Sequence, residues 1–135
     1  MWFENLGIKI EIRQMDFASY VTAQQNLDYD LSLGGWSGDY LDPSTFLLMW
    51  TKDNGNNNTG WSNPKFESLL SDAAKQTDPS QRLGVFREAE RLLMDEQPCT
   101  PIDWRARNYL LRPEVKGWYP LLLDNHPWAK VSLDP

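Results

Sequence analysis

Between Tyr29 and Pro43 the chain reads YDLSLGGWSGDYLDP. The first six residues, Tyr29 to Gly34, predict a β-strand, and the residues after them predict a glycine-rich loop that ends in acidic residues and a proline. Ligands of open α/β sheets bind beyond the carboxyl ends of the parallel strands. This loop therefore lies where such a sheet is expected to carry its binding site.

The residues before this stretch supply the rest of a βαβ unit. Gly7 to Ile12 reads GIKIEI, which alternates apolar with charged or small residues, as a strand with one buried face does. Asp16 is suited to cap a helix that continues to Asn26. The side chains of this helix at helical spacing are Phe17, Tyr20, Val21 and Gln24. The order strand, short helix, strand predicts two parallel strands with a right-handed crossover.

Two longer helices are predicted after the loop. Asn63-Pro64 supplies an N-cap and a proline at the first helical position, and Asp78-Pro79 repeats this signal. Pro98 ends the second helix. The predicted buried stripes are Phe66, Leu69, Leu70, Ala73 and Ala74 in the first helix and Leu83, Phe86, Ala89, Leu92 and Leu93 in the second. The charged residues of the second helix, Arg82 included, are expected mostly on its wet face as possible i,i+4 pairs.

Shorter elements are predicted in the remaining sequence. Phe46 to Trp50 predicts a helical turn, and Lys52 to Gly60 predicts an exposed loop in which Asn57 and Asn58 form turns. The asparagines of this loop lack the frame and closing glutamate of a calcium loop, so no metal is expected there. Short strands are expected at Cys99 to Asp103, Tyr109 to Leu111 and Ala129 to Leu133. The fold class is therefore α/β.

The composition disfavours several functional classes. The 135 residues are 41% hydrophobic, enough for one domain of ordinary size. With 13 Lys and Arg against 19 Asp and Glu, the net charge of −6 disfavours a nucleic-acid partner, because phosphate binding needs a basic patch. One cysteine, Cys99, and one histidine, His126, disfavour disulfides and clustered metal ligands, so no cofactor is expected. No apolar run approaches the roughly 20 residues that span a bilayer, so no membrane insertion is expected.

A longer pattern extends on both sides of the glycine-rich loop. The loop reads Gly35-Trp36-x-Gly38-Asp39-x-x-Asp42-Pro43-x-x-Phe46, and GIKIEI with an aromatic-led helix precedes it. NNNTGWSNP, a helix beginning at DP, a PCTPI segment and LRPEVKGW follow it. These segments, in this order and over nearly the whole chain, resemble the C-terminal part of the extracytoplasmic oligopeptide- and dipeptide-binding proteins of bacterial ABC importers, in the peptide/nickel class of solute-binding proteins.

This resemblance implies a fragment of a two-lobed periplasmic-binding-protein-like fold that closes around a ligand. Its parts would be the βαβ unit, the scaffold helices and the short C-terminal strands. Residues 1–115 would form the later half of the second ligand-binding lobe, and residues 116–135 would cross back toward the first lobe. The full-length protein would be periplasmic or at the cell surface, and the lack of signal-peptide features at the Met1 end would reflect truncation.

The resemblance also implies a function and a role for each residue of the loop. The protein would bind short peptides for delivery to ABC permease subunits, and it would not be an enzyme. Asp39 corresponds to the anchor of the peptide's free α-amino group, and the backbone around Gly35, Trp36 and Ser37 corresponds to partners of the peptide main chain. A carboxylate facing a cleft forms a charge-assisted bond with an ammonium group, and main-chain bonds give affinity whatever the side chains.

Structural roles stay open for the same residues. Asp39 could cap a helix or a turn, and Asp42, which precedes Pro43, is expected to start the following helical turn. Trp36 and Trp61 could contact a ligand or pack structurally, since a large flat apolar ring suits both. The sequence alone leaves this choice open.

Other functions remain as alternatives. The same fold could hold another small solute, such as an oligosaccharide or a nickel complex. A hydrolase with Asp39 and Asp42 as acid and base is an alternative of another class, although two carboxylates on one loop rarely flank a bond as glycosidases require. Covalent catalysis by Ser37 is disfavoured, because the G-x-S-x-G motif is absent. A purely structural domain would need an exposed apolar stripe beyond those that the helices commit to the core.

Overall fold

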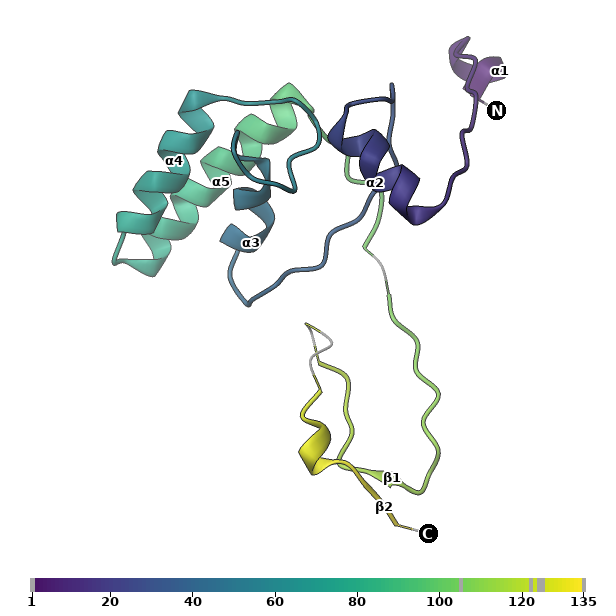
Figure 1. Ribbon diagram of the computed structural model, residues 1–135. Helices are drawn as coiled ribbons and strands as arrows, with labels where there is room; N and C mark the ends of the chain where they lie inside the picture. The colour runs from purple at the N-terminus through teal and green to yellow at the C-terminus, as the bar shows by residue number, and fades with distance from the viewer. Residues whose placement is uncertain (1, 105, 122, 124–125, 135) are drawn as a thin grey trace. The chain divides into compact units, whose positions relative to one another are not determined.

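The chain divides into two compact units, Met1–Leu33 and Gly34–Pro135. The computed structural model describes residues 2–104, 106–121, 123 and 126–134, and Figure 1 shows their helices and strands. In this part of the chain, no helix is both long enough and apolar enough to cross a membrane.

The first unit contains two helices, α1 (Trp2–Leu6) and α2 (Phe17–Gln25). Asp16 caps α2 as predicted, because its carboxylate accepts the Ser19 backbone N–H at 3.1 Å and the Ser19 hydroxyl at 2.6 Å. These two bonds hold the pKa of the Asp16 carboxyl below its usual range. Helix α2 buries none of its side chains within this chain, and Phe17 is 79% exposed. Its position is therefore set by the cap and by polar contacts.

The segment after α2 lies along that helix. The Tyr20 hydroxyl donates a hydrogen bond to the Leu33 carbonyl at 3.1 Å, and the Gln24 amide donates to the Ser32 hydroxyl at 2.9 Å. The Arg13 guanidinium reaches Asp28 through both its backbone carbonyl, at 2.8 Å, and its carboxylate, at 3.1 Å. Tyr20 and Gln24 hold the segment against α2, and Arg13 joins it to the residues before the helix, without forming a sheet.

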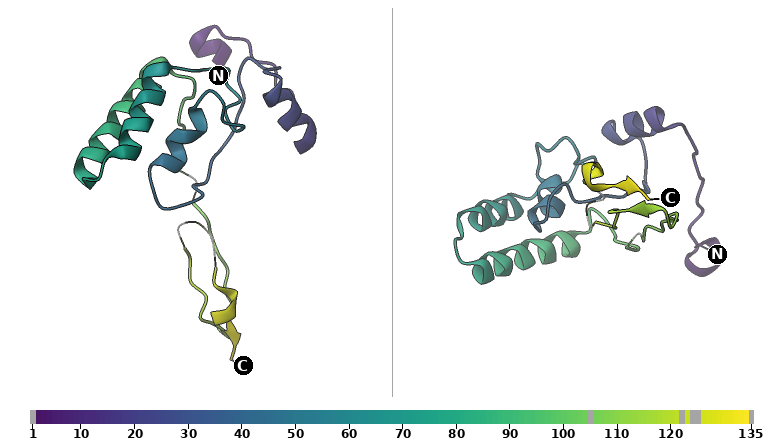
Figure 2. Two further views of the ribbon diagram at one scale, coloured as in Figure 1. Left: turned by 60° about the vertical axis from the view of Figure 1, so that its left-hand side comes forward. Right: turned by 90° about the horizontal axis from the view of Figure 1, so that it is seen from below.

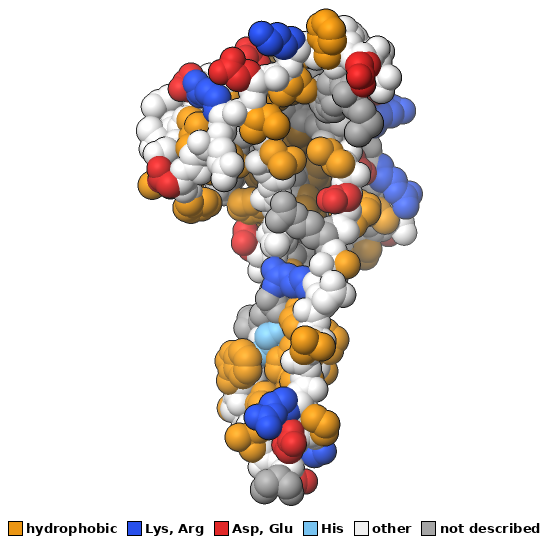
Figure 3. Space-filling model, turned by 90° about the vertical axis from the view of Figure 1, so that its right-hand side faces the viewer, with side chains coloured by type: hydrophobic (Ala, Val, Ile, Leu, Met, Phe, Trp, Pro, Cys, Tyr) orange, Lys and Arg blue, Asp and Glu red, His pale blue; other side chains and the backbone are white. Residues whose placement is uncertain are grey.

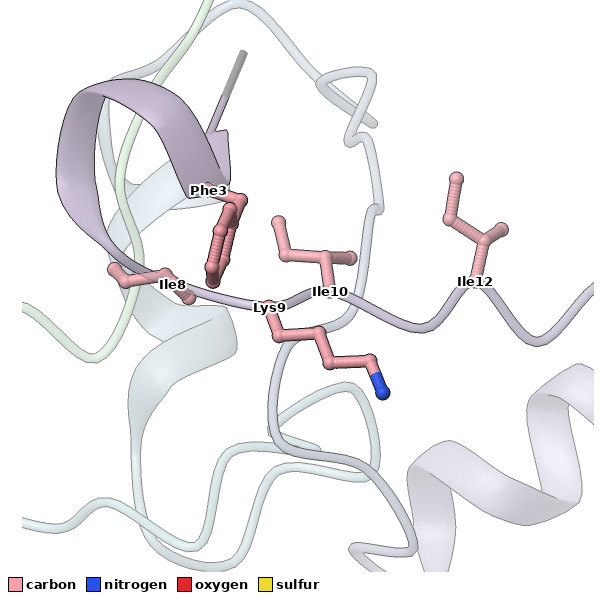
Figure 4. A pocket seen from close by; sticks show the side chains of 5 residues that line it. All are labelled: Phe3, Ile8, Lys9, Ile10 and Ile12. Carbon is pink, nitrogen blue, oxygen red and sulfur yellow. The ribbon is translucent and has the colours of Figure 1, made fainter.

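The two predicted strands of the βαβ unit are not strands in this chain. Residues 7–12 and 29–34 have no partner strand among the described residues, and Ile8, Ile10 and Ile12 are 47%, 44% and 87% exposed. Figure 4 shows the alternation that suggested a strand, with Ile10 and Ile12 on one side of the backbone and Lys9 on the other. The correction has a physical reason, because a strand exists only where a neighbour pairs with its N–H and C=O groups.

The second unit is built on an antiparallel helix pair, α4 (Pro64–Lys75) and α5 (Pro79–Glu96), which lie side by side in Figures 1 and 2. Both predicted caps are confirmed. The Asn63 side chain accepts the N–H groups of Lys65 and Phe66, and the Asp78 carboxylate accepts the N–H of Gln81 at 2.8 Å. Helix α5 ends two residues before Pro98, as predicted.

The core of the second unit lies between these helices and a short helix packed on them. That helix, α3 (Ser44–Leu47), continues into the 3-10 turn η1 (Leu48–Trp50), which confirms the helical turn predicted at 46–50. The buried core side chains are Leu47, Phe66, Leu70, Ala73, Phe86, Ala89 and Leu93. Ala74 and Leu83 were predicted in the buried stripes but are exposed, because contact between two helices covers only the centre of each stripe.

The C-terminal part of the second unit forms a small hairpin. Strands β1 (Val115–Lys116) and β2 (Ser132–Leu133) pair antiparallel, and the 3-10 turn η2 (Trp128–Lys130) comes just before β2. The strands predicted at 99–103 and 109–111 are wrong, and only residues 132–133 of the strand predicted at 129–133 are paired. Where pairing is absent, nothing in the described chain presents a strand edge to these segments.

An aromatic cluster holds the hairpin segments together. The ring of His126 lies 4.9 Å from Trp118, 5.7 Å from Trp128 and 6.4 Å from Tyr109, and Tyr109 stacks edge-on against Trp118 at 4.8 Å. Figure 3 shows the pale-blue His side chain among hydrophobic ones. Residues 109, 118, 126 and 128 are thereby joined by ring contacts rather than by sheet hydrogen bonds.

Candidate functional site

The glycine-rich loop is fixed to α3 by one buried residue, Thr45. Its hydroxyl accepts the backbone N–H of Asp39 at 2.9 Å, and its carbonyl accepts the indole N–H of Trp36 at 3.2 Å. Thr45 is only 4% exposed, so these two bonds are shielded from water. Both ends of the Trp36–Asp39 segment are therefore held against the first turn of α3.

Asp42 fixes the second half of the loop. Its carboxylate accepts the N–H of Ser44 at 3.0 Å, which caps the start of α3. The same carboxylate accepts two hydrogen bonds from the guanidinium of Arg82, at 2.6 Å and 2.8 Å. The Arg82 contact, followed by the Ser44 contact, holds the pKa of the Asp42 carboxyl well below its usual range, while Asp42 raises the pKa of Arg82. The structural role predicted for Asp42 is confirmed.

The Asp39 carboxylate is arranged differently from that of Asp42. The backbone of Asp39 is anchored to Thr45, but its side chain is exposed. Within the described part of the chain, the Asp39 carboxylate accepts no hydrogen bond and makes no ion pair. A carboxylate whose backbone is fixed and whose oxygens accept no hydrogen bond can bind a cationic group with little loss of conformational entropy.

Gly38 sets the close packing beside Asp39. A Cβ atom at this position would lie 3.1 Å from Cζ of Phe46 and 3.1 Å from Cγ2 of Thr45. Those distances are tighter than normal side-chain contacts, so any larger residue would push the loop or its neighbours aside. Glycine therefore fits beside Asp39 without any movement of Phe46 or Thr45.

The remaining predicted loop residues lie on the surface. Gly35 and Ser37 are exposed, and Trp36 is 37% exposed although its indole N–H is bound. A hollow in the second unit is lined by Pro43, Thr77, Pro79, Arg82, Leu83 and Phe86. Residues 35–39 do not line this hollow, and all of them except Gly38 are exposed, so the loop presents an open face.

The chain is similar in sequence to known binding proteins of bacteria. The model of the bacterial extracellular solute-binding proteins, family 5 middle, matches residues 1–58. The oligopeptide-binding protein OppA of Bacillus subtilis strain 168 is 36% identical over 118 residues, which are 87% of this chain and 22% of OppA. The probable deoxycholate-binding periplasmic protein YgiS of Escherichia coli strain K12 is 32% identical over 117 residues, 87% of this chain and 22% of YgiS.

The chain is therefore similar to the bacterial extracellular solute-binding proteins, at residues 1–58 by the family model and over 87% of its length by these two relatives. A solved structure agrees: the periplasmic oligopeptide-binding protein OppAIV of Borrelia burgdorferi matches with a TM-score of 0.85 and 26% identity over 98% of this chain and 27% of that one. The predicted α/β binding-protein fold is confirmed. The chain spans 22% of the length of Bacillus subtilis OppA and of YgiS.

Trp61 is a half-buried side chain of the second unit. Its indole N–H donates to the Glu96 carboxylate at 2.7 Å, and its ring lies edge-on to Phe66 at 5.1 Å. Glu96 also accepts a hydrogen bond from the Asn63 amide at 2.6 Å. The predicted ligand role of Trp61 is thus limited to the exposed part of its ring, because its polar atom is occupied.

Asn57 holds the loop that leads to Trp61. Its side-chain nitrogen donates to the carbonyls of Trp50, Thr51 and Trp61 at 3.1, 3.1 and 3.0 Å. Its side-chain oxygen accepts the Thr59 hydroxyl at 2.7 Å. The prediction that Asn57 forms turns is confirmed, and the loop at 52–60 is an organised part of the fold.

The two aspartates of the loop are poorly suited to acid-base hydrolysis. Both oxygens of Asp42 bind Arg82, and its lowered pKa keeps it ionised at neutral pH, so it has no proton to donate.

Cys99 is half-buried, and burial raises the pKa of its thiol, which disfavours the reactive thiolate. Among the described residues, no group of three or more His, Cys, Asp or Glu side chains could hold a metal ion.

The sequence did not identify Arg82 as part of this site. Arg82 was expected on the wet face of its helix with a partner on the same helix, but it pairs with Asp42, 40 residues away. Across the helix pair, Glu88 likewise meets Lys65 of α4, at 3.4 Å. The sequence offered one signal for this pair, an arginine near the first turn of a helix with an acidic loop before it. Their spacing alone does not predict that the two residues pair.

Proposed function

We propose that this chain is part of a two-lobed extracytoplasmic binding protein that captures short peptides and delivers them to the permease of an ABC importer. Asp39 binds the free α-amino group of the peptide, and the backbone of Gly35, Trp36 and Ser37 binds its main chain. The exposed parts of the Trp36 and Trp61 rings contact the cargo. The protein binds and releases its cargo unchanged, without a catalytic step.

One observation carries this proposal: in the described part of the chain, the Asp39 carboxylate accepts no hydrogen bond, while the Asp39 backbone is anchored. The Asp39 N–H is bound to Thr45 at 2.9 Å, and the side chain is exposed. Nearby Asp42 is fully engaged with Arg82 and Ser44, so a cationic cargo group meets one open carboxylate on this loop. A charge-assisted bond of this kind contributes about 1.5–3 kcal/mol, and more when a closing cleft excludes water.

The proposed place of the chain in the whole protein has separate support. Residues 1–115 form the later half of the second lobe, and residues 116–135 cross back toward the first. The exposed isoleucines at 8, 10 and 12 form a strand pattern that has no partner strand in the described part of the chain. The relatives are more than four times as long as the part that this chain covers. Strands from the rest of the protein would complete the sheet.

Closure of the two lobes gives the proposed transport cycle. The loop at 35–39 is an open face, so cargo docked on it stays exposed until a second wall covers it. A cargo that contacts both lobes favours the closed state by the difference in its contacts with the two states, and the permease then recognises that closed form.

A second candidate cargo is an acidic steroid, favoured by the 32% identity to a relative named as a probable deoxycholate-binding protein. Deoxycholate carries a carboxylate and no amine, so the Asp39 side chain would repel it. An oligosaccharide would leave that charge without an ionic partner. The state of the cargo amine therefore separates the peptide hypothesis from these alternatives.

The test is isothermal titration of the longer protein with trialanine, N-acetyl-trialanine and deoxycholate. Trialanine binds, and acetylation of its amine weakens binding by at least about tenfold, because the ionic bond to Asp39 is lost. Asp39→Asn gives a loss of similar size for trialanine and little further loss for the acetylated peptide. The matched control is Asp53→Asn, an exposed aspartate of the second unit, which leaves both affinities unchanged.

Two outcomes contradict the proposal. Equal affinity for trialanine and its acetylated form removes Asp39 from the anchor role. Binding of deoxycholate without any binding of trialanine replaces the peptide cargo by an acidic steroid.

A further inference from the structure

We infer that Arg82 of helix α5 is a positioning residue for the ligand-binding loop, acting through Asp42 to hold the Asp39 carboxylate where it meets the cargo amine. The inference rests on the proposed function of Asp39. Arg82 acts on the loop and does not touch the cargo, because its guanidinium is occupied by Asp42.

The contact between Arg82 and Asp42 fixes orientation as well as distance. Nη1 donates to one carboxylate oxygen at 2.6 Å, and Nη2 donates to the other at 2.8 Å. The two side chains are 32% and 28% exposed, so water screens the pair less than it screens a fully exposed one. Two parallel bonds between planar groups resist rotation, which a single lysine ammonium does not.

The scaffold beneath Arg82 is rigid. The guanidinium carbon lies 4.6 Å from the ring centre of Phe86, which is one turn further along α5 and only 4% exposed. The backbone N–H of Arg82 donates to the Asp78 carbonyl at 3.0 Å, in the capped first turn of the helix. Arg82 therefore links Asp42 to the packed α4–α5 core.

Short hydrogen bonds connect Asp42 to Asp39. The Asp42 N–H donates to the Tyr40 carbonyl at 3.0 Å, and the Asp42 carbonyl accepts the Thr45 N–H at 3.1 Å. Thr45 in turn accepts the Asp39 N–H through its hydroxyl at 2.9 Å. A displacement of Asp42 thus reaches Asp39 along the loop and also through Thr45.

Pairing with Arg82 also determines which carboxylate the cargo meets. Asp39 and Asp42 are three residues apart in sequence, and two open carboxylates would offer an amine two competing positions. Because Arg82 neutralises Asp42, the loop presents a single open acid at Asp39. A binding group that is off by about 1 Å loses much of its contribution, so this selection matters for affinity.

The decisive experiment is a double-mutant cycle between Arg82 and Asp39 in the longer protein, with trialanine as the probe. Arg82→Gln weakens binding about fivefold when Asp39 is present and less than about twofold in the Asp39→Asn background. Arg82→Lys, which keeps the charge but not the two parallel bonds, gives an intermediate loss. Arg87→Gln on the exposed face of the same helix is the matched control and changes neither affinity.

Two results overturn the positioning role. The first is an unchanged trialanine affinity in Arg82→Gln. The second is an equal loss in the presence and absence of Asp39, since a merely structural arginine lowers both affinities alike.

A measurement without cargo separates this inference from the proposed function. Amide hydrogen exchange reports the Asp39 N–H bond to Thr45 directly. Arg82→Gln speeds exchange of the Asp39 amide about fivefold, and Arg87→Gln does not. If trialanine fails to bind the unsubstituted protein while this exchange effect is present, the proposed function is wrong and the positioning of the loop stands. If the exchange rate is unchanged, the positioning role is wrong whatever the cargo.

Discussion

The side chain of Asn57 offers a sharp test of how the second unit is held together. One amide nitrogen donates to three carbonyls, those of Trp50, Thr51 and Trp61, at 3.0–3.1 Å. Both tryptophans pack against the helical core, so the amide joins the two ends of the 52–60 loop to that core. Asn57→Asp changes almost no volume but replaces the donor by an acceptor.

The expected cost follows from these contacts. The two N–H bonds of the amide contribute about 1 kcal/mol each, so their removal costs about 2 kcal/mol. The new carboxylate also faces carbonyl oxygens in a half-buried site, which raises the loss to about 3 kcal/mol at neutral pH. A loss of about 3 kcal/mol shifts the unfolding equilibrium by roughly 150-fold. Below the pKa of the new carboxyl the loss shrinks, because the protonated group can donate one hydrogen bond again.

Urea unfolding followed by far-UV circular dichroism measures this loss at pH 7 and pH 4. Asn56→Asp is the matched control, since it makes the same chemical change on an exposed residue of the same loop whose backbone N–H bond to Asn54 survives. The reasoning is refuted if the two variants unfold at the same urea concentration.

Three further predictions concern the core, the hairpin and the pH dependence. Phe66→Ala lowers the free energy of unfolding, measured in urea, by about 3–5 kcal/mol, because this ring is fully buried. Phe46→Ala, at a position 46% exposed, lowers the free energy of unfolding clearly less. Equal losses in the two variants would contradict the core assignment. Gly117→Ala abolishes the Val115–Leu133 cross-strand contacts in NMR spectra. Residue 117 has a φ of +75°, and a Cβ atom there would lie 2.0 Å from the Lys130 carbonyl oxygen. Gly55→Ala is the control, because a Cβ atom at residue 55 meets open space and leaves these contacts intact. The pKa of Asp42 is lowered in the folded state, so its contribution to stability is present above the unfolded pKa of about 3.9 and declines as the pH falls below it. The difference in free energy of unfolding between the unsubstituted protein and Asp42→Asn is therefore constant from pH 6 to 7 and smaller at pH 3. An equal difference at pH 3 would refute the ion pair.

The helix boundaries could be predicted because their signals are local. Asp16, Asn63 and Asp78 each cap a helix through N–H groups two or three residues away, and proline occupies the first position of two of these helices. The strands could not be predicted in the same way. The alternation at Ile8, Ile10 and Ile12 is compatible with a strand, but a strand also needs a neighbour, and none lies in the described part of this chain.

The site divides in the same way between local and distant contacts. The order of glycines and acids predicted that Asp39 lies on an exposed loop and that Asp42 begins the next helical turn, and both positions agree with the structure. The pairing of Asp42 with Arg82 joins residues 40 positions apart, and no spacing rule in a single sequence indicates it. The binding roles of Gly35, Trp36, Ser37, Asp39 and Trp61 stay predictions.

In the proposed complex, the Asp39 carboxylate binds the positively charged amino terminus of the peptide cargo. A crystal structure of the longer protein with trialanine bound tests it most directly, through the distance from the peptide's terminal nitrogen to the Asp39 carboxylate oxygens. We expect a nitrogen to oxygen distance of about 2.7–3.0 Å, as in charge-assisted hydrogen bonds. A peptide whose amine is bound by other groups, with Asp39 facing solvent, would contradict it.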